Sequence, residues 1–216
     1  MTSGDVKDLQ PEAYFNLNDC YFSDIFKDIN FVWEALSKTK DYITNVFHEG
    51  IIKPDYKNNF VFIGKGTIIQ EGVQIQGPAV IGKNCFLGHS SFIRENCILG
   101  EGVHIGHAVE IKNSIFLNKA VAAHLNYIGD SIIGNNVNIS GGAILANFRL
   151  DKKSVSIKKG GKKIETCLDK FSSIVGDDVI IGVNSVLNPG TLIGKNSLVY
   201  PLTSVSGFYA AYSIIK

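Results

Sequence analysis

The sequence has very little arginine, no long apolar run and no excess of either charge. Its 216 residues include 21 basic and 20 acidic side chains, so the formal net charge of +1 creates no general attraction for nucleic acid or membranes. Arg94 and Arg149 are the only arginines, so a planar, forked donor is present at just two positions. No stretch approaches the roughly 20 apolar residues of a membrane span, and the N-terminus MTSGDVKDLQPE lacks the basic and apolar regions of a signal peptide.

Cysteine is also scarce. Cys20, Cys85, Cys97 and Cys167 form no CxxC pair and no short-range framework, which argues against a zinc knuckle or a disulfide-stapled fold. A reduced, cytoplasmic setting is therefore expected. Hydrophobic residues make up 45% of the chain and charged residues 19%, which is enough apolar material for a packed core and excludes wholesale disorder.

An aliphatic residue recurs every six positions through the middle of the chain. The first run consists of Ile63, Ile69, Ile75, Ile81, Leu87, Ile93, Leu99, Ile105, Ile111 and Leu117. The spacing slips between Ala123 and Ile133, resumes through Leu145, and returns from Val175 to Val205. A six-residue period fits neither an α-helix nor ordinary strand alternation, but it is typical of hexapeptide repeats in parallel β-helices.

In such a repeat each hexapeptide supplies one short strand and one corner. Three hexapeptides make a triangular coil, and successive coils stack about 4.8 Å apart. The aliphatic side chains fill the axis, and the next position turns the corner, which favours glycine, as at Gly64, Gly82 and Gly100. The predicted fold is all-β, a left-handed parallel β-helix. The hand is that of known hexapeptide proteins, because the usual crossover rule would predict the opposite.

Two segments lie outside the repeat. Residues 1–57 form an N-terminal extension, and residues 58–216 the β-helix domain. The extension is expected to contain an amphipathic helix over about 30–48 that acts as a helical cap on the open N-terminal end of the coil. Its helix would end near Gly50 and place on one side Trp33, Leu36, Ile43 and Phe47.

The second such segment, 151–172, reads as an inserted β-hairpin. The pair Gly160-Gly161 suits a two-residue turn between strands over 154–159 and 162–167. Four lysines, at positions 158, 159, 162 and 163, favour a solvated hairpin with protected edges over a phosphate clamp.

Arg94 and Lys112 occupy corner positions where glycine is usual. They are 18 residues apart, so they should stack on one corner of adjacent coils. Two cations that close repel each other unless an anion lies between them, and a phosphate is the natural candidate. The alternative is two surface cations that spread into water.

His124 also falls in a corner position by this count, five hexapeptides after Arg94 and therefore on a different corner. A neutral imidazole is the usual general base near pH 7. Tyr127, Asn138 and Asn147 add hydrogen-bonding groups in the next coils. Packing of one prism against another in a trimer would bring the two corners together.

A competing arrangement uses other imidazoles. His89 and His107 are 18 residues apart and should also stack. They could share a metal ion, as in the β-helical gamma-class carbonic anhydrases, with His104 or a neighbouring subunit supplying a third ligand. Two stacked histidines without a clear third partner are more often surface residues.

The stretch 94–147 resembles the acetyltransferase domain of the bifunctional glucosamine-1-phosphate acetyltransferase and N-acetylglucosamine-1-phosphate uridylyltransferase family. Its most specific run is HLNYIGDSIIGNNVNISGGAILAN, and the resemblance extends over about 58–205, toward the archaeal sugar-1-phosphate branch. The family's nucleotidyltransferase domain carries a G-x-G-T-R-M loop that is absent here. The resemblance therefore implies acetylation without uridylylation, unless a separate polypeptide performs the second step.

The resemblance also implies roles for individual residues. Arg94 and Lys112 would hold the sugar phosphate, and Lys153 would add a further phosphate contact. His124 would act as the catalytic base, and Asn147 would lie between the sugar and the acetyl group.

The same resemblance places other groups on the sugar and on the cofactor. Tyr127 and Asn138 would orient the sugar. Acetyl-CoA would follow a groove between neighbouring prisms past Phe148, Gly182 and Val183, and no metal is expected. The family's arginine-rich C-terminal tail has no counterpart in the ending AYSIIK.

These features together predict a cytoplasmic homotrimer that acetylates glucosamine-1-phosphate, or its galacto epimer, for UDP-N-acetylhexosamine and cell-envelope synthesis. No nucleic-acid or membrane partner is expected. Two alternatives stay open: a non-catalytic sugar-phosphate-binding or oligomerising partner of a nucleotidyltransferase, and a carbonic-anhydrase-like metal enzyme.

Overall fold

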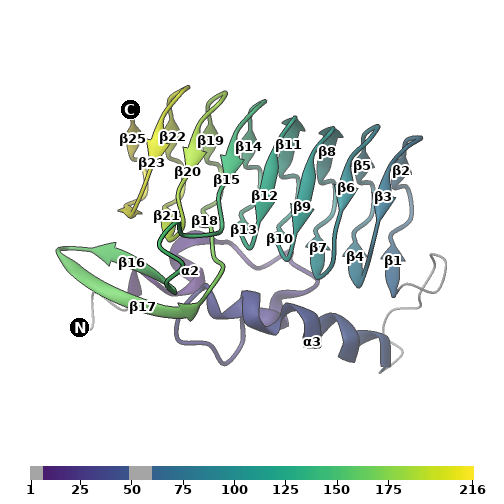
Figure 1. The fold of residues 1–216 in the computed structure, drawn as a ribbon. Helices are drawn as coiled ribbons and strands as arrows, with labels where there is room; N and C mark the ends of the chain where they lie inside the picture. Colours follow the sequence, from purple (N-terminus) through teal and green to yellow (C-terminus); the bar gives the residue numbers. More distant parts are fainter. Residues whose placement is uncertain (1–6, 49–59) are drawn as a thin grey trace.

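Three parallel sheets wrap around one axis in the computed structural model, which describes residues 7–48 and 60–216 (Figure 1). The first sheet contains β1 (Val61–Ile63), β4 (Ala79–Ile81), β7 (Cys97–Leu99), β10 (Ile115–Phe116), β13 (Ile132–Ile133), β18 (Ser173–Val175), β21 (Thr191–Ile193) and β24 (Phe208–Tyr209). The second contains β2 (Ile68–Ile69), β5 (Phe86–Leu87), β8 (His104–His107), β11 (Val121–His124), β14 (Asn138–Ile139), β19 (Ile180–Ile181), β22 (Leu198–Val199) and β25 (Ile214–Ile215). The third contains β3 (Gln74–Ile75), β6 (Phe92–Ile93), β9 (Glu110–Lys112), β12 (Tyr127–Gly129), β15 (Ile144–Leu145), β20 (Val186–Leu187) and β23 (Ser204–Val205).

Each complete coil contributes one strand to each sheet, and the last coil ends after β25 without a strand in the third sheet. Every strand pairs in parallel with its counterpart one coil away, such as Ile81 with Leu99. The predicted left-handed parallel β-helix is confirmed. The repeating aliphatic side chains are buried along the axis in one continuous core. This burial explains the six-residue period, because each hexapeptide places a large aliphatic side chain at the same point of the core, with smaller side chains such as Cys97 and Val103 between them.

The six-residue period shifts at an earlier point in the chain than the sequence suggested. Ile98 pairs with Ile115, so that coil has 17 residues and not 18. Phe116 therefore lies in the axial core, whereas Leu117, predicted for that place, packs in the cluster outside the first sheet. The prediction for Leu117 was wrong because Phe116 and Leu117 are both apolar, and only the strand register decides which of them faces the axis.

Glycine is required where the coils approach most closely. A Cβ on Gly106 would overlap the backbone carbonyl oxygen of Ala123 in the next coil.

We expect Gly106→Ala to lower the free energy of unfolding by about 1–3 kcal/mol, the range for overpacking a close contact. Gly141→Ala is the matched control, since its Cβ would meet only ordinary contacts at 3.6 Å or more. Thermal unfolding of both variants measures the difference. Equal midpoints would show that the close contact at Gly106 does not require glycine.

The N-terminal segment runs along the outer face of the first sheet (Figure 1). It contains α2 (Pro11–Tyr14), η1 (Ser23–Phe26) and α3 (Glu34–His48). Trp33, Leu36 and Ile43 pack in one cluster with outward-facing residues of that sheet, including Ile98 and Ile115. The expectation that the helix caps the end of the coil was wrong, because the outer face of the first sheet is itself apolar and the helix is buried against it. The Phe47 side chain, Gly50 and the proposed boundary at 57–58 lie outside the described residues.

A buried carboxylate fixes this segment to the coil. Asp177 accepts hydrogen bonds from the backbone amide of Asn16 at 2.7 Å and from that of Asn135 at 2.7 Å. Its own amide donates to the carbonyl oxygen of Tyr14. Burial raises the pKa of Asp177, and the hydrogen bonds that it accepts act against this shift.

The predicted hairpin is present as β16 (Val155–Lys159) and β17 (Lys162–Leu168), paired antiparallel. Gly160 and Gly161 have φ angles of 56° and 75°, a left-handed conformation that suits glycine in a two-residue turn. One face of the hairpin is buried in the cluster that also holds the N-terminal segment, through Val155, Ile157 and Ile164. The hairpin is therefore anchored and only partly solvated.

All four cysteines are free, as expected from their spacing, and only Cys167 is exposed. In the described part of the chain, no helix has the length and apolar character needed to cross a membrane.

Candidate functional site

The corner between the third and first sheets carries the two predicted phosphate ligands. Arg94 follows β6 and Lys112 ends β9, so they stack on adjacent coils as expected. Glu95 lies within reach of both, 3.6 Å from Arg94 Nε and 3.7 Å from Lys112 Nζ. Arg94 Nη1 also donates to Glu110 Oε1 at 2.9 Å, and this bond raises the pKa of Arg94. The anion between the stacked cations is therefore the protein's own Glu95, and their proximity alone does not require a bound phosphate.

A hydrogen-bonded cluster extends this corner. Asn147 Nδ2 donates to Tyr127 Oη at 3.1 Å and to Asp130 Oδ2. Asn113 Nδ2 donates to the other carboxylate oxygen of Asp130 at 2.8 Å, and Lys112 Nζ lies 4.0 Å from Oδ2. Burial and the nearby Asp130 raise the pKa of Tyr127, which keeps its hydroxyl protonated. Two predicted site residues, Tyr127 and Asn147, thus belong to the corner of Lys112.

Sequence reasoning missed the carboxylates of this corner. Asp130 is only 4% exposed, and its position in the run HLNYIGD, next to the corner, was the available signal. Glu110 precedes Lys112 by two residues, so its side chain leaves the same strand on the same face, toward Arg94. Counting acidic as well as basic residues at 18-residue spacing would have found Asp130, which follows Lys112 by 18 positions, but not Glu110, which follows Arg94 by 16.

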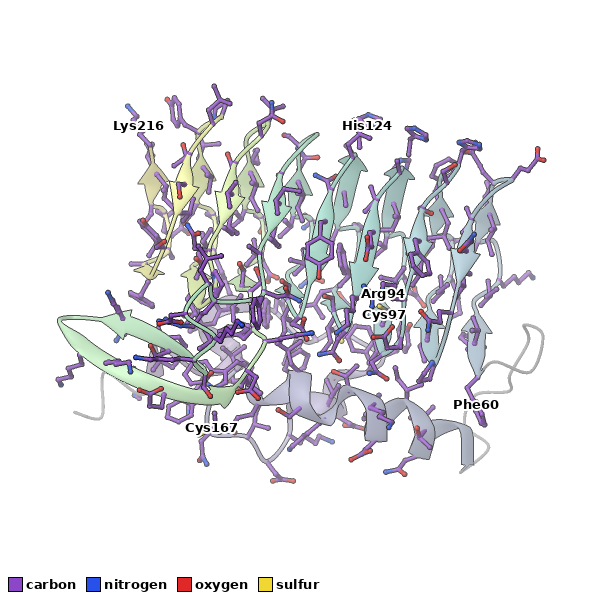
Figure 2. All side chains as sticks on the ribbon, in the orientation of Figure 1. Phe60, Arg94, Cys97, His124, Cys167 and Lys216 are labelled. Atoms are coloured by element: carbon purple, nitrogen blue, oxygen red, sulfur yellow. The ribbon has the colours of Figure 1, made fainter. Side chains whose placement is uncertain are left out.

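His124 lies on a different corner, between the second and third sheets, and its side chain is exposed. Figure 2 shows it at the upper edge of the β-helix, whereas Arg94 lies lower, toward α3. The position of His124 within its coil differs by one residue from the prediction. The shortened coil places Ala123 opposite Gly106 and pairs His124 with His107. The expected separation of the His124 and Arg94 corners within one chain is confirmed.

A buried amide holds the backbone at His124. Asn126 Oδ1 accepts a hydrogen bond from the His124 amide at 3.2 Å. Asn126 Nδ2 donates to the carbonyl oxygens of Ser140 at 2.8 Å and Ala143 at 3.1 Å. The imidazole therefore projects from a turn that is tied to the following coil.

The remaining sugar-side residues lie around these corners. Asn138 is half-buried on β14, between Val121 and Ile180 on the face of the second sheet. The backbone of Tyr127 begins β12 just after the corner of His124, whereas its hydroxyl reaches Asn147 at the corner of Lys112. Lys153 is exposed in the connection to the hairpin, where its amide donates to Asp151 Oδ1 at 3.3 Å.

The predicted cofactor residues fall into two places. Gly182 and Val183 follow β19 on the same edge as His124, and register places Val183 in the column of His124 and Gly141. Phe148 lines a cavity of about 810 Å³ between the hairpin and the last coils, with Lys158, Asn188 and Phe208 among the other lining residues. One chain therefore does not bring all three together.

The stacked imidazoles are also present. The rings of His89 and His107 are 5.4 Å apart and nearly parallel. His104 does not join them, because its ring stacks on Phe86 at 4.5 Å on the face of the second sheet. No group of three or more His, Cys, Asp or Glu side chains suited to a metal ion occurs within residues 7–48 and 60–216.

Comparison with known proteins assigns the family. Residues 75–188, more than half of the chain, match the family model described as the GMPPB C-terminal domain. The chain belongs to the GMPPB C-terminal domain family. The matched range runs from β3 to just beyond β20 and includes both corners described above.

Curated relatives agree with the resemblance seen in the sequence. The bifunctional protein GlmU of Methanococcus vannielii is 34% identical over 171 residues, covering 76% of this chain and 40% of the relative. A bifunctional sugar-1-phosphate nucleotidylyltransferase/acetyltransferase of Sulfurisphaera tokodaii is 33% identical over 88 residues, covering 41% of this chain and 22% of the relative. The chain thus spans less than half of the length of these relatives, and the predicted relationship to the GlmU acetyltransferase region is confirmed.

Solved structures with a similar course of the chain are more distant. One is AntD, an N-acyltransferase from Bacillus cereus, in complex with dTDP and 3-hydroxybutyryl-CoA. It is 19% identical with a TM-score of 0.30, covering 73% of this chain and 76% of the other.

Proposed function

We propose that the chain transfers an acetyl group from acetyl-CoA to the amine of glucosamine-1-phosphate or a close epimer. The observation that carries this proposal is the 34% identity with GlmU over 171 residues that include His124, Tyr127 and Asn147. The exposed imidazole of His124, held by a turn tied to the next coil, supports it. The proposal combines this imidazole with a cationic corner for the phosphate and a thioester donor.

The chemistry needs one base and one set of amide donors. His124 takes a proton from the sugar amine as the amine nitrogen attacks the thioester carbonyl carbon. A C–N bond forms, the C–S bond breaks, and coenzyme A leaves as the thiol after taking up the proton that His124 removed from the amine. The oxyanion is assigned to the backbone N–H of Val183, in the same column as His124, since the amides of Gly182 and Asn184 already donate to the carbonyl oxygens of Val199 and Gly141.

A homotrimer is part of the proposal, because a complete site needs two edges. The cationic corner and His124 lie on different edges of one chain, so a neighbouring prism would supply the second. The outer face of the second sheet supports such packing. Four of its strands expose aliphatic side chains there: Ile68, Ile180, Leu198 and Ile214.

The sugar phosphate is assigned to Arg94 and Lys112, with Lys153 as a further contact. Lys112 is only 17% exposed and Arg94 31%, so the surroundings hold both cations in place. A phosphate there competes with Glu95 and Glu110 for the guanidinium, and a doubly charged anion with three acceptor oxygens is a stronger partner than a single carboxylate.

Arg94→Ala should raise the KM for glucosamine-1-phosphate by about 10- to 100-fold, as expected for one charged hydrogen bond, and leave the KM for acetyl-CoA unchanged. Steady-state kinetics with each substrate varied in turn would measure this. The unphosphorylated sugar is the internal control, since its weak turnover should not depend on Arg94. Equal effects on both sugars would remove Arg94 from phosphate binding.

The direct test of the function is thiol release from acetyl-CoA, measured with glucosamine-1-phosphate, galactosamine-1-phosphate and glucosamine. Turnover is expected with at least one phosphorylated amino sugar, and comparison of the two identifies the epimer. Failure to release thiol with either would overturn the assignment. It would instead favour the alternative of a non-catalytic partner of a separate nucleotidyltransferase.

A further inference from the structure

One edge of the β-helix carries a column of three imidazoles. His89, His107 and His124 follow one another on this edge in successive coils, because His89 and His107 are stacked and His107 pairs in register with His124. All three side chains are exposed. The acetyl-transfer proposal uses only His124, so His89 and His107 are left without an assigned role.

The geometry of the lower pair suits a metal ion. The Nδ1 atoms of His89 and His107 are 3.4 Å apart. Zinc binds imidazole nitrogen at about 2.0–2.1 Å, which places two ligand nitrogens of a tetrahedral site about 3.3–3.4 Å apart. The same separation is long for a hydrogen bond between the two rings. The two Nδ1 atoms therefore lie at the spacing of two ligands on one ion.

One of the other polar contacts of the pair must be given up when an ion binds. His107 Nδ1 donates a hydrogen bond to the carbonyl oxygen of His89 at 3.0 Å. Ser90 Oγ lies 3.1 Å from His89 Nδ1 and 3.4 Å from its Nε2, and can donate to either. A metal ion would require His107 to carry its proton on Nε2 instead. This change of tautomer exchanges protons with solvent and leaves the ring neutral.

We propose that His89 and His107 form a two-ligand site for a divalent transition-metal ion such as Zn²⁺, with water completing the coordination. Imidazole nitrogen is a preferred ligand for zinc, and an exposed pair leaves room for solvent ligands. The next coil, about 4.8 Å farther along the axis, carries His124. A bound ion would thus lie beside the proposed base, and this regulatory consequence rests on the proposed function.

Equilibrium dialysis with ZnCl2 in the absence of substrates tests the site without relying on activity. The wild-type chain is expected to retain one more Zn²⁺ ion than His89→Gln or His107→Gln. His104→Gln is the matched control, because that exposed imidazole stacks on Phe86 outside the column. Cys167→Ser is a second control, since the exposed thiol could bind zinc separately. Both controls should retain the ion.

Equal zinc retention by wild type, His89→Gln and His107→Gln would overturn the site. The variants change exposed side chains, and matching thermal unfolding curves would show that they are folded. Inhibition of thiol release by Zn²⁺, scaled to each variant's own metal-free rate, tests the consequence for His124. Loss of inhibition in His107→Gln is expected, and inhibition equal to that of wild type would contradict it. The wild-type chain could release no thiol while His89→Gln and His107→Gln still bind one Zn²⁺ ion fewer than it does. That result would refute the proposed function and not the metal site.

Discussion

Replacing His124 with alanine is expected to slow acetyl transfer by about 10²- to 10⁴-fold, the usual effect of removing a positioned general base. The exposed imidazole makes no packing contribution that the fold needs, and its backbone amide still binds Asn126. Stability should therefore change little. The decrease should appear in kcat, because the base acts on the amine only as the C–N bond forms.

Thiol release at saturating substrate measures this effect, and thermal unfolding confirms that the variant is folded. His104→Ala is the matched control, since it removes another exposed imidazole from the same sheet three residues from the column. A His124→Ala chain with the wild-type rate would exclude His124 as the base. Equal losses in both variants would point to a general effect of removing imidazoles.

Trp33→Ala should lower the free energy of unfolding by about 3–5 kcal/mol, the range for truncating a buried tryptophan. Trp33 is 1% exposed. Its ring stacks on Phe31 at 4.6 Å and meets Phe171 at 6.4 Å, so it joins the N-terminal segment to the chain that follows the hairpin. Its removal would leave a cavity between the segment and the first sheet that the rigid coil cannot close.

Trp33 is the only tryptophan, so unfolding is best followed by circular dichroism and not by fluorescence. Leu150→Ala is a suitable control, because this large apolar side chain is 99% exposed and should contribute little. A Trp33→Ala midpoint within experimental error of the Leu150→Ala midpoint would show that the N-terminal segment does not stabilise the β-helix.

The site shows where inference from the sequence ends. Stacking of Arg94 on Lys112 followed from an 18-residue spacing, since equal steps around a solenoid return to the same corner. Nothing in that spacing revealed that Glu95 and Glu110 pair with these cations, because side-chain direction at a corner depends on local backbone angles. The column of His89, His107 and His124 was likewise hidden by one shortened coil.

The sequence by itself determined the β-helix, its hairpin and the separation of the cationic corner from His124. The reason is physical: an axis of stacked aliphatic residues repeats identically in every coil, so its period can be read without knowing the surroundings. Only the tertiary structure decided that Phe116 and not Leu117 faces the axis, and that α3 covers the first sheet and not the end of the coil. Those choices depend on strand register and on which apolar surfaces compete for burial, and neither is encoded in a local period.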